Sequence, residues 1–357
     1  MDSSLFAYHL PDERIAQEPA SARDASRLLV VHRSERRIEH RRFSDLPEFL
    51  GARDSIFRNN ARVLPARLYA QRQTGGAVEC LLLRPASNDG LEWWTLIRPG
   101  KKLPVGSTFA RDGFFSASVV EKNEKAEYRV RFSLERHASV PALADELGKM
   151  PLPPYIARDK SDDRDDSDKE RYQTVYAAAD KSVAAAAPTA GLHFTPAIVE
   201  KLAAQGATFH DLALHVGMGT FKPIQCERVE DHQIHREIYE IPESTQNAIR
   251  TPNSRRRVCV GTTSVRSIED YLAKSTTIQT GNFVGEADIF IYPPRDFRGV
   301  DALITNFHQP HSTLLCLVSS FLDPNGTDGI AWLKEIYAEA INMKYRFLSY
   351  GDAMLIL

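Results

Sequence analysis

Hydrophobic and polar positions divide the chain into parts with two different patterns. After about residue 195, helical patterns alternate with short runs of apolar residues, which is typical of an α/β domain. Residues 63–150 instead show short strand-like runs separated by turn signals, with little helical periodicity before 140–147. We therefore predict an α/β main domain, a layered mixed sheet with helices, formed by residues 1–62 and 151–357. Residues 63–150 are predicted to form an inserted antiparallel β-barrel domain.

The same patterns predict individual elements. Strand-like runs cover 63–70, 77–83, 93–97, 114–120 and 128–134 in the insertion, and 27–31, 212–216, 258–260, 289–292 and 303–304 in the main domain. Helical patterns cover 45–50, 140–147, 172–179 and 314–321, and further helices follow Pro196 and Arg266. The segments 33–42 and 159–170 are rich in charge, so we expect an exposed turn and an exposed loop there.

Capping residues mark two of these helices. Thr195 is the predicted N-cap of a helix whose first residue is Pro196, and Gly206 is its predicted stop. Ser312 is in the same position before the apolar helix at 314–321. These signals place the stretch before Thr195 on a loop that enters a helix N-terminus.

Composition excludes several classes of protein. The chain has 357 residues, 43% of them hydrophobic and 26% charged, as in a globular protein long enough for two domains. No run approaches the roughly 18 apolar residues of a membrane span, and residues 1–17 lack the layout of a signal peptide. The four cysteines lie far apart and form no Cys-x-x-Cys pair. We therefore expect a reduced, cytoplasmic protein without membrane association.

The stretch 183–194 is the first candidate for a ligand site. Five small residues lead to Pro188, and Thr189, Gly191 and His193 follow before the next helix. Small residues let a ligand approach the backbone, and the threonine and histidine offer hydrogen-bonding or acid/base groups. A small-residue packing loop with a structural histidine remains an equal alternative at this point.

Four loops that follow predicted strands carry polar residues, and such loops build the ligand sites of open α/β sheets. The turn Gly261-Thr262-Thr263-Ser264 offers hydroxyls and amides at a helix start, which suits a carboxylate or phosphate. Arg266 could pair bidentately with a carboxylate. Further polar candidates are His215, Glu269, Asn306 and His308. We predict that these loops converge on one pocket, although capping and core packing are ordinary roles for the same residue types.

Motifs for other chemistries are missing or weak. The chain has no Gly-Lys-Ser/Thr phosphate loop, no strand followed by Gly-x-Gly-x-x-Gly, and no Gly-x-Ser-x-Gly elbow. His232 with His235, and His308 with His311, are each spaced three apart, which invites a metal interpretation. Neither pair has the His-Glu-x-x-His layout and no cysteine pair supports it, so we expect no metal site.

Basic and amide residues suggest contact with nucleic acid. The net charge is −2, but arginines cluster locally, and phosphate binding needs only one basic face. Asn59, Asn60, Arg62 and Arg67 follow one another along a predicted strand and its exit. An asparagine side chain both donates and accepts, which suits a base or ribose, so we predict RNA binding here. A plain turn with a solvated surface is the alternative.

At these stretches the chain resembles the S-adenosylmethionine:tRNA ribosyltransferase-isomerase family of the queuosine pathway. The matching segments are Asn59–Leu68, Met150–Ile156, Tyr172–Tyr176, Ala186–Thr195, Leu214–Phe221, Gly261–Arg266, Ile289–Pro293, Thr305–Pro310 and Tyr345–Met354. They extend over essentially the whole chain. The resemblance implies an α/β domain with an inserted barrel, in agreement with the change of pattern at 63–150.

The resemblance also implies a reaction. The ribosyl part of S-adenosylmethionine would be transferred to 7-aminomethyl-7-deazaguanine in a tRNA anticodon and isomerised, giving epoxyqueuosine with release of adenine and methionine and without a metal. His193 or His215 would then remove a proton beside the sulfonium, and Glu269 would help adenine leave. The remaining roles would be carboxylate binding by Thr262, Thr263, Ser264 and Arg266, and ribose or base contacts by Asn306 and His308.

Departures from the family pattern include Val183, where glycine is expected, and Arg58, where phenylalanine is expected. Val183 removes backbone freedom near the predicted pocket, which could weaken the site. Two alternatives stay open: a non-catalytic tRNA or nucleotide-binding protein on the same scaffold, and a metal-dependent hydrolase that uses the paired histidines. We expect a monomer.

Overall fold

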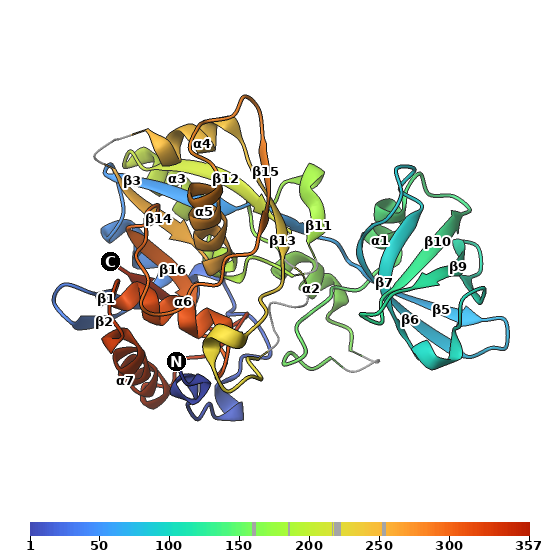
Figure 1. Cartoon of the computed structure of the whole chain (residues 1–357), viewed down its shortest axis with the longest axis horizontal. Coiled ribbons are helices and arrows are strands. Elements are labelled where there is room, and N and C mark those ends of the chain that lie inside the picture. The colour runs from blue at the N-terminus through green and yellow to red at the C-terminus, as the bar shows by residue number, and fades with distance from the viewer. Residues whose placement is uncertain (159–161, 185, 216, 218–222, 252–254) are drawn as a thin grey trace.

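The computed structural model describes residues 1–158, 162–184, 186–215, 217, 223–251 and 255–357. Within these residues nine strands form one mixed sheet in the order β15-β13-β12-β3-β14-β16-β17-β1-β2 (Figure 1). The strands are β1 (Arg27–His32), β2 (Arg37–Arg42), β3 (Asp54–Asn59), β12 (Thr208–Leu214), β13 (Glu237–Ile241), β14 (Arg256–Val260), β15 (Phe283–Ala287), β16 (Ala302–Asn306) and β17 (Ala353–Ile356).

The centre of this sheet is parallel. Strand β12 runs parallel to β3, β3 to β14, and β14 to β16. Strand β13 runs antiparallel to β12, β15 antiparallel to β13, and β17 antiparallel to β16. The carboxyl ends of the four parallel strands therefore lie at one edge. The predicted mixed sheet is confirmed, and this edge is where a ligand site is expected.

Alternate residues along the strands enter two hydrophobic clusters, one on each face of the sheet. Leu29 and Val31 of β1 pack on one face, and Leu28 and Val30 pack on the other. The first face is covered by α4 (Glu243–Arg250), α5 (Thr262–Lys274), α6 (Thr313–Leu322) and α7 (Asp328–Asn342). The second is covered by α3 (Pro196–Ala204) and a 3₁₀ helix, Phe43–Glu48. Strands buried on both faces explain the nearly continuous apolar runs.

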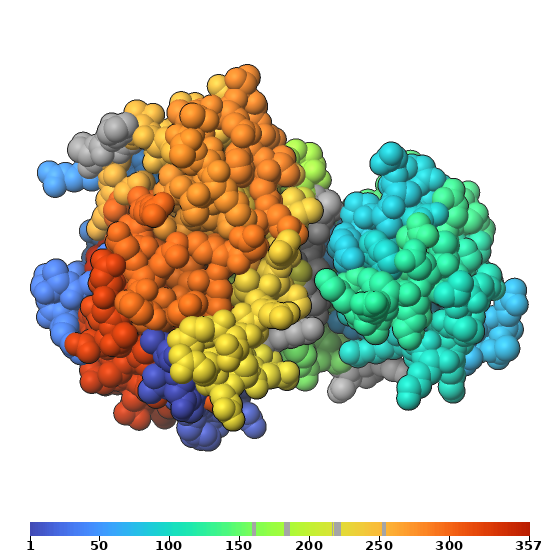
Figure 2. All heavy atoms as spheres, viewed as in Figure 1, coloured from blue at the N-terminus to red at the C-terminus, as the bar shows by residue number. Residues whose placement is uncertain are grey.

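The insertion is a closed antiparallel barrel with its own core. Its six described strands follow the order β10-β7-β6-β5-β8-β9, and Figure 2 shows it as a separate lobe. The strands are β5 (Arg67–Arg72), β6 (Ala77–Pro85), β7 (Glu92–Arg98), β8 (Thr108–Arg111), β9 (Phe115–Lys122) and β10 (Tyr128–Leu134). Helix α1 (Val140–Leu147) packs against the barrel. The predicted barrel is confirmed, and its boundaries at 63 and 150 stay a prediction.

Two further elements connect the lobes. The short strand β4 (Arg62–Val63) pairs in parallel with β11 (Ser182–Ala184), and α2 (Asp165–Arg171) lies between the main sheet and the barrel (Figure 1). Val183, one of the departures from the family pattern, lies on β11. Among the described residues, no helix combines the length and apolar character that a membrane span requires.

The predicted caps are confirmed. The side chain of Thr195 accepts a hydrogen bond from the backbone amide of Ile198, and Ser312 accepts one from Leu315. Gly206 has a φ of +90°, the left-handed conformation that glycine adopts readily after a helix. The residue types at these helix ends were therefore sufficient to predict where the helices begin or end.

Several predicted elements are wrong. Residues 37–42 form strand β2 at the sheet edge rather than a turn, since pairing with β1 outweighs their charge. Residues 289–292 form no strand, and 172–179 form no helix beyond a 3₁₀ start at Ala179. In the acidic segment 159–170, residues 159–161 lie outside the described residues, and the rest contributes most of α2. Strand β8 was not predicted at all.

Candidate active site

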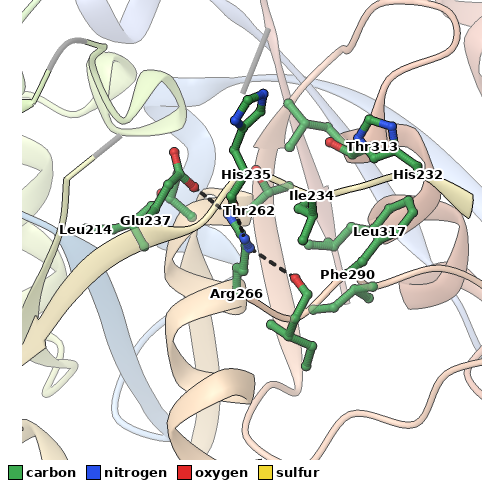
Figure 3. Close-up of a pocket in the computed structure, with 14 residues that line it drawn as sticks. Leu214, His232, Ile234, His235, Glu237, Thr262, Arg266, Phe290, Thr313 and Leu317 are labelled. Atoms are coloured by element: carbon green, nitrogen blue, oxygen red, sulfur yellow. Dashed lines mark hydrogen bonds and ion pairs between the residues drawn. The ribbon is translucent and has the colours of Figure 1, made fainter. Parts of the chain in front are cut away.

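Two adjoining cavities lie at the carboxyl edge of the parallel strands. Cavity A is lined by residues 187–190, 261–263, 305–309 and 348–349, with Tyr155, Ser312 and Leu314. Cavity B is lined by Leu214, residues 289–291 and several residues of 232–237, α5 and α6 (Figure 3). Including the parts open to solvent, they hold about 680 and 570 Å³ of empty space. Polar residues of several strand-end loops line both cavities, which makes this edge the candidate ligand site.

The start of helix α5 separates the two cavities. Thr262 and Thr263 line both of them. Gly261, the N-cap of this helix, has a φ of +86° and has no side chain with which to cap it. Thr263 Oγ1 is buried without a hydrogen-bond partner in the described part of the chain. The first amides of a helix have no partner within the helix, so together with this hydroxyl they could receive an anionic group such as the predicted carboxylate.

Asn306 joins three segments at the floor of cavity A. Its Oδ1 accepts a hydrogen bond of 2.8 Å from Thr189 Oγ1, and its Nδ2 lies 3.3 Å from His193 Nε2. On the other side of the ring, His193 Nδ1 lies 2.7 Å from Ser26 Oγ, which also lies 3.2 Å from the Arg23 carbonyl. These contacts are consistent with a proton on Nδ1 and a lone pair on Nε2, because Asn306 Nδ2 is a donor.

Burial keeps His193 neutral. The ring is 4% exposed, and burial lowers its pKa to about 3, helped by the nearby charges of Arg346 and Arg23. A neutral imidazole with a lone pair toward cavity A can accept a proton or a hydrogen bond. His193 does not line cavity A itself but connects to it through Asn306.

Arg266 lines cavity B but is fully engaged by the protein (Figure 3). Its guanidinium forms a buried ion pair with Glu237 and donates to the carbonyl oxygens of Ile289 at 3.1 Å, Ala287 at 2.8 Å and His235 at 2.6 Å. The predicted pairing with a ligand carboxylate would have to compete with these bonds. The structure gives Arg266 a role in holding the wall of the cavity.

His308 lines cavity A and is also neutral. Its Nε2 lies 2.9 Å from Thr305 Oγ1, and burial lowers its pKa to about 3. His311 does not line this cavity, and the described residues contain no group of three His, Cys, Asp or Glu side chains placed to hold a metal ion.

The low pKa of His308 predicts how stability depends on pH. The unfolded chain binds a proton near pH 6.5, whereas the folded protein resists protonation until about pH 3, so acidification favours unfolding. The stabilising contribution is thus present above about pH 6.5 and is lost as the pH falls toward 3. We expect His308→Gln to lose less free energy of unfolding than the wild type between about pH 7 and 5, measured by urea unfolding. An equal loss in both proteins would contradict this.

His215 stands at the carboxyl end of β12, on the loop that leads to Gly217. Its Nε2 lies 3.4 Å from Glu240 Oε1, and burial lowers its pKa despite this carboxylate. It lines neither cavity, although Leu214 before it lines cavity B. Most of the following loop, residues 216 and 218–222, lies outside the described residues.

Glu269 and Ser264 lie away from both cavities. Glu269 Oε1 accepts the backbone amides of Gly299 at 2.8 Å and Arg298 at 3.0 Å, and Oε2 accepts that of Arg298 at 3.2 Å. Burial raises the pKa of this carboxyl group. Ser264 donates to the Val260 carbonyl at 2.8 Å. The structure therefore does not bring these two residues to the ligand side of α5, and each has a bonding role within the fold.

Gly191 is needed for close packing rather than for lining cavity A. A Cβ at this position would lie 2.1 Å from Tyr176 Oη and 2.8 Å from Thr174 Cγ2. We expect Gly191→Ala to cost about 1–3 kcal/mol of unfolding free energy through overpacking. Adding Tyr176→Phe should recover part of this loss. The measurement is urea unfolding, and a single variant as stable as the wild type would contradict the packing argument.

Three of the four residues predicted to bind RNA, Asn59, Arg62 and Arg67, have side chains that bond within the protein. Asn59 is completely buried, and its side chain bonds to the backbone of Leu214 and Ala61, so it has no surface for RNA. Arg62 pairs with Asp145 of α1 at 2.9 Å, and Arg67 pairs with Glu79 of β6. Asn60 is half-buried, and its side-chain oxygen has no partner among the described residues.

The predicted convergence of loops is found in part. The loops after β14 and β16 meet the 187–190 segment in cavity A, and residues 289–291 reach only cavity B. No single described cavity is lined by His193, His215 and Arg266 together. Sequence reasoning missed Ser26 and Glu237, which the patterns do not distinguish from other serines and glutamates. The only unusual feature of the sequence near Ser26 is the high density of charged residues around Arg23.

The fold and the cavities define an α/β protein with a barrel insertion and a ligand site at the carboxyl edge of its parallel strands. Residues 3–356 match the family described as queuosine biosynthesis protein. The S-adenosylmethionine:tRNA ribosyltransferase-isomerases of Thermotoga maritima and Symbiobacterium thermophilum are 45% and 46% identical to this chain, each over 100% of both chains.

A solved structure agrees with this relationship. The crystal structure of S-adenosylmethionine tRNA ribosyltransferase from Thermotoga maritima matches with a TM-score of 0.53 and 35% identity, covering 99% of this chain and 100% of that chain. The chain therefore belongs to the queuosine biosynthesis protein family and is an enzyme, which confirms the predicted family membership.

Proposed function

We propose that this enzyme transfers the ribosyl moiety of S-adenosylmethionine to 7-aminomethyl-7-deazaguanine in tRNA and isomerises it. The products are epoxyqueuosine in the tRNA, adenine and methionine. Family membership supports the type of reaction, and the arrangement of cavity A carries the proposal for this chain. There, an uncapped helix start and the Thr189–Asn306–His193 hydrogen-bond array meet at the carboxyl edge of the sheet.

The start of α5 suits the methionine end of S-adenosylmethionine. Its first backbone amides and the hydroxyls of Thr262 and Thr263 would bind the carboxylate, which is favoured at a helix N-terminus. Since Arg266 and Ser264 bond to the protein, we assign them supporting roles in the wall and in the helix. Asn306 and His308 would contact ribose hydroxyls or the modified base from the floor of cavity A.

Proton removal beside the sulfonium is assigned to His193. Its neutral ring presents Nε2 toward Asn306, and Ser26 fixes the opposite nitrogen. His215 with Glu240 is the second candidate, because a carboxylate beside an imidazole stabilises the protonated ring. The Glu269 carboxylate bonds to the backbone amides of residues 298–299 and lines neither cavity A nor cavity B, so it is not placed to protonate adenine. We therefore assign no residue as the acid that helps adenine leave.

The release of free adenine tests the proposal. Purified protein, S-adenosylmethionine and tRNA carrying 7-aminomethyl-7-deazaguanine are expected to give adenine in amounts equal to modified tRNA, also in the presence of a chelator. tRNA binding without adenine would favour a non-catalytic binding protein, and loss of activity with the chelator would favour metal chemistry. We expect His193→Ala to lower turnover about a hundredfold or more and His215→Ala to lower it less. Wild-type turnover in His193→Ala would contradict the assignment of the base but not the reaction.

A further inference from the structure

A third cavity lies on the opposite side of His193 from cavity A. This cavity C holds about 260 Å³, including the part open to solvent, and is lined by Arg23, Arg171, Ser26, His193 and residues 349–351. Ser349 lines both cavities. The histidine ring thus stands between a cavity suited to a small molecule and a second one with arginines in its wall.

The two arginines of cavity C bond to backbone carbonyls and to no carboxylate among the described residues. Arg23 donates to Leu192 at 3.1 Å and Glu170 at 2.8 Å, and Arg171 donates to Ala20 at 2.7 Å. Arg171 Nε is buried and has no partner in the described part of the chain. Two guanidinium groups in one cavity without a paired counter-ion favour an anionic ligand.

Among the described residues, no neighbouring carboxylate forms an ion pair with either arginine. Burial lowers the pKa of Arg23, and the charge of Arg171 lowers it further, whereas the exposed carboxylate of Glu170 raises it. Two further carboxylates of this region are already paired. Asp168 forms an ion pair with Arg158 at 2.7 Å, and Asp352 forms one with Arg346 at 3.4 Å.

We propose that cavity C binds a phosphodiester group of the substrate RNA through Arg23 and Arg171. The inference rests on the proposed function, which requires an RNA strand to pass beside His193. A phosphate offers oxygens to both planar guanidinium groups, which is the geometry that arginine recognises best. Its negative charge would also offset the charge of Arg23, one of the groups that lower the pKa of His193.

Helix α2 connects this site to the barrel. Arg171 is its last residue, and its first residue, Asp165, pairs with Lys149 at 2.6 Å just after α1. Lys169 donates to the Asp145 carbonyl of α1 at 3.3 Å. An RNA strand bound at cavity C would therefore lie close to the junction of the two lobes (Figure 1).

The test is the salt dependence of tRNA binding. Each lost phosphate contact removes about 0.7–0.9 from the slope of log affinity against log salt concentration. We expect Arg171→Gln and Arg23→Gln to show this change and to weaken binding about tenfold at low salt. Arg171→Lys should keep most of the slope, since it keeps the charge. Arg36→Gln, an exposed arginine on the β1–β2 turn, is the matched control and should bind as the wild type does.

A second measurement uses the wild type and needs no variant. At constant ionic strength, replacing chloride by inorganic phosphate should weaken its tRNA binding. Unchanged slopes in both glutamine variants, or equal loss in Arg171→Lys and Arg171→Gln, would overturn the phosphate site, as would insensitivity of the wild type to phosphate. If the wild type releases no adenine but the glutamine variants still lose slope, the proposed function fails and the phosphate site stands.

Discussion

Asn306→Ala is expected to lower turnover about a hundredfold while the protein stays folded. The side chain is 2% exposed and contacts Thr189, His193 and the Leu348 carbonyl, so its loss frees His193 Nε2 and removes a wall of cavity A. Adenine release measures the effect. The substitution removes the hydrogen bonds that orient His193, the proposed base, so kcat should decrease by a larger factor than KM for S-adenosylmethionine increases.

An asparagine that lines neither cavity provides the control for this result. Asn342, the exposed last residue of α7, lies on an element that contributes to neither cavity, and Asn342→Ala should keep wild-type turnover. Thr189→Ala removes one of the bonds to Asn306 and should cost about tenfold. Wild-type turnover in a folded Asn306→Ala protein would remove the hydrogen-bond array from the mechanism.

Arg266→Leu is expected to cost about 3–5 kcal/mol of unfolding free energy. The side chains of Arg266 and Glu237 are only 12% and 5% exposed, so the substitution removes the buried positive charge that faces the Glu237 carboxylate. Three backbone carbonyls lose their donor as well. Urea unfolding at one pH measures the loss. Glu237→Gln should cost less, because Arg266 keeps its carbonyl bonds.

The neighbouring arginine offers the control. Arg236 pairs with Glu286 at 3.3 Å, but the two side chains are 66% and 53% exposed. Arg236→Leu should therefore change stability by less than about 0.5 kcal/mol. The comparison also decides between two roles for Arg266. If it binds a substrate carboxylate instead, Arg266→Leu raises KM and leaves stability near the wild-type value.

The elements that the sequence predicted best are those governed by local chemistry. Helix 140–147, the Thr195 and Ser312 caps and most barrel strands follow from periodicity, hydroxyl capping and turn residues. Strand β2 was missed because its charged residues gain order only by pairing with β1 at the sheet edge. The position of residues 289–292 likewise depends on tertiary contacts, here the bond from Arg266 to Ile289.

The candidate site was predicted at the level of loops and less well at the level of side chains. Thr262, Thr263, Asn306 and His308 were predicted as polar residues on strand-end loops, and Thr189 on the small-residue stretch before a helix. All of them line cavity A. Arg266, Asn59 and Glu269 are residue types that could bind a ligand, but each bonds instead to a group of the protein that is distant in sequence. A partner such as Glu237 or the amide of Gly299 becomes visible only in three dimensions.

The barrel enters and leaves the main lobe through one paired stem. Arg67 and Lys149 exchange two backbone hydrogen bonds, of 3.1 and 3.0 Å, so the chain departs and returns at the same point. The barrel core also forms a cluster separate from those of the sheet. A short loop joining the two sides of the stem would thus close the remaining polypeptide, which makes this lobe exchangeable as a cassette during evolution or protein engineering.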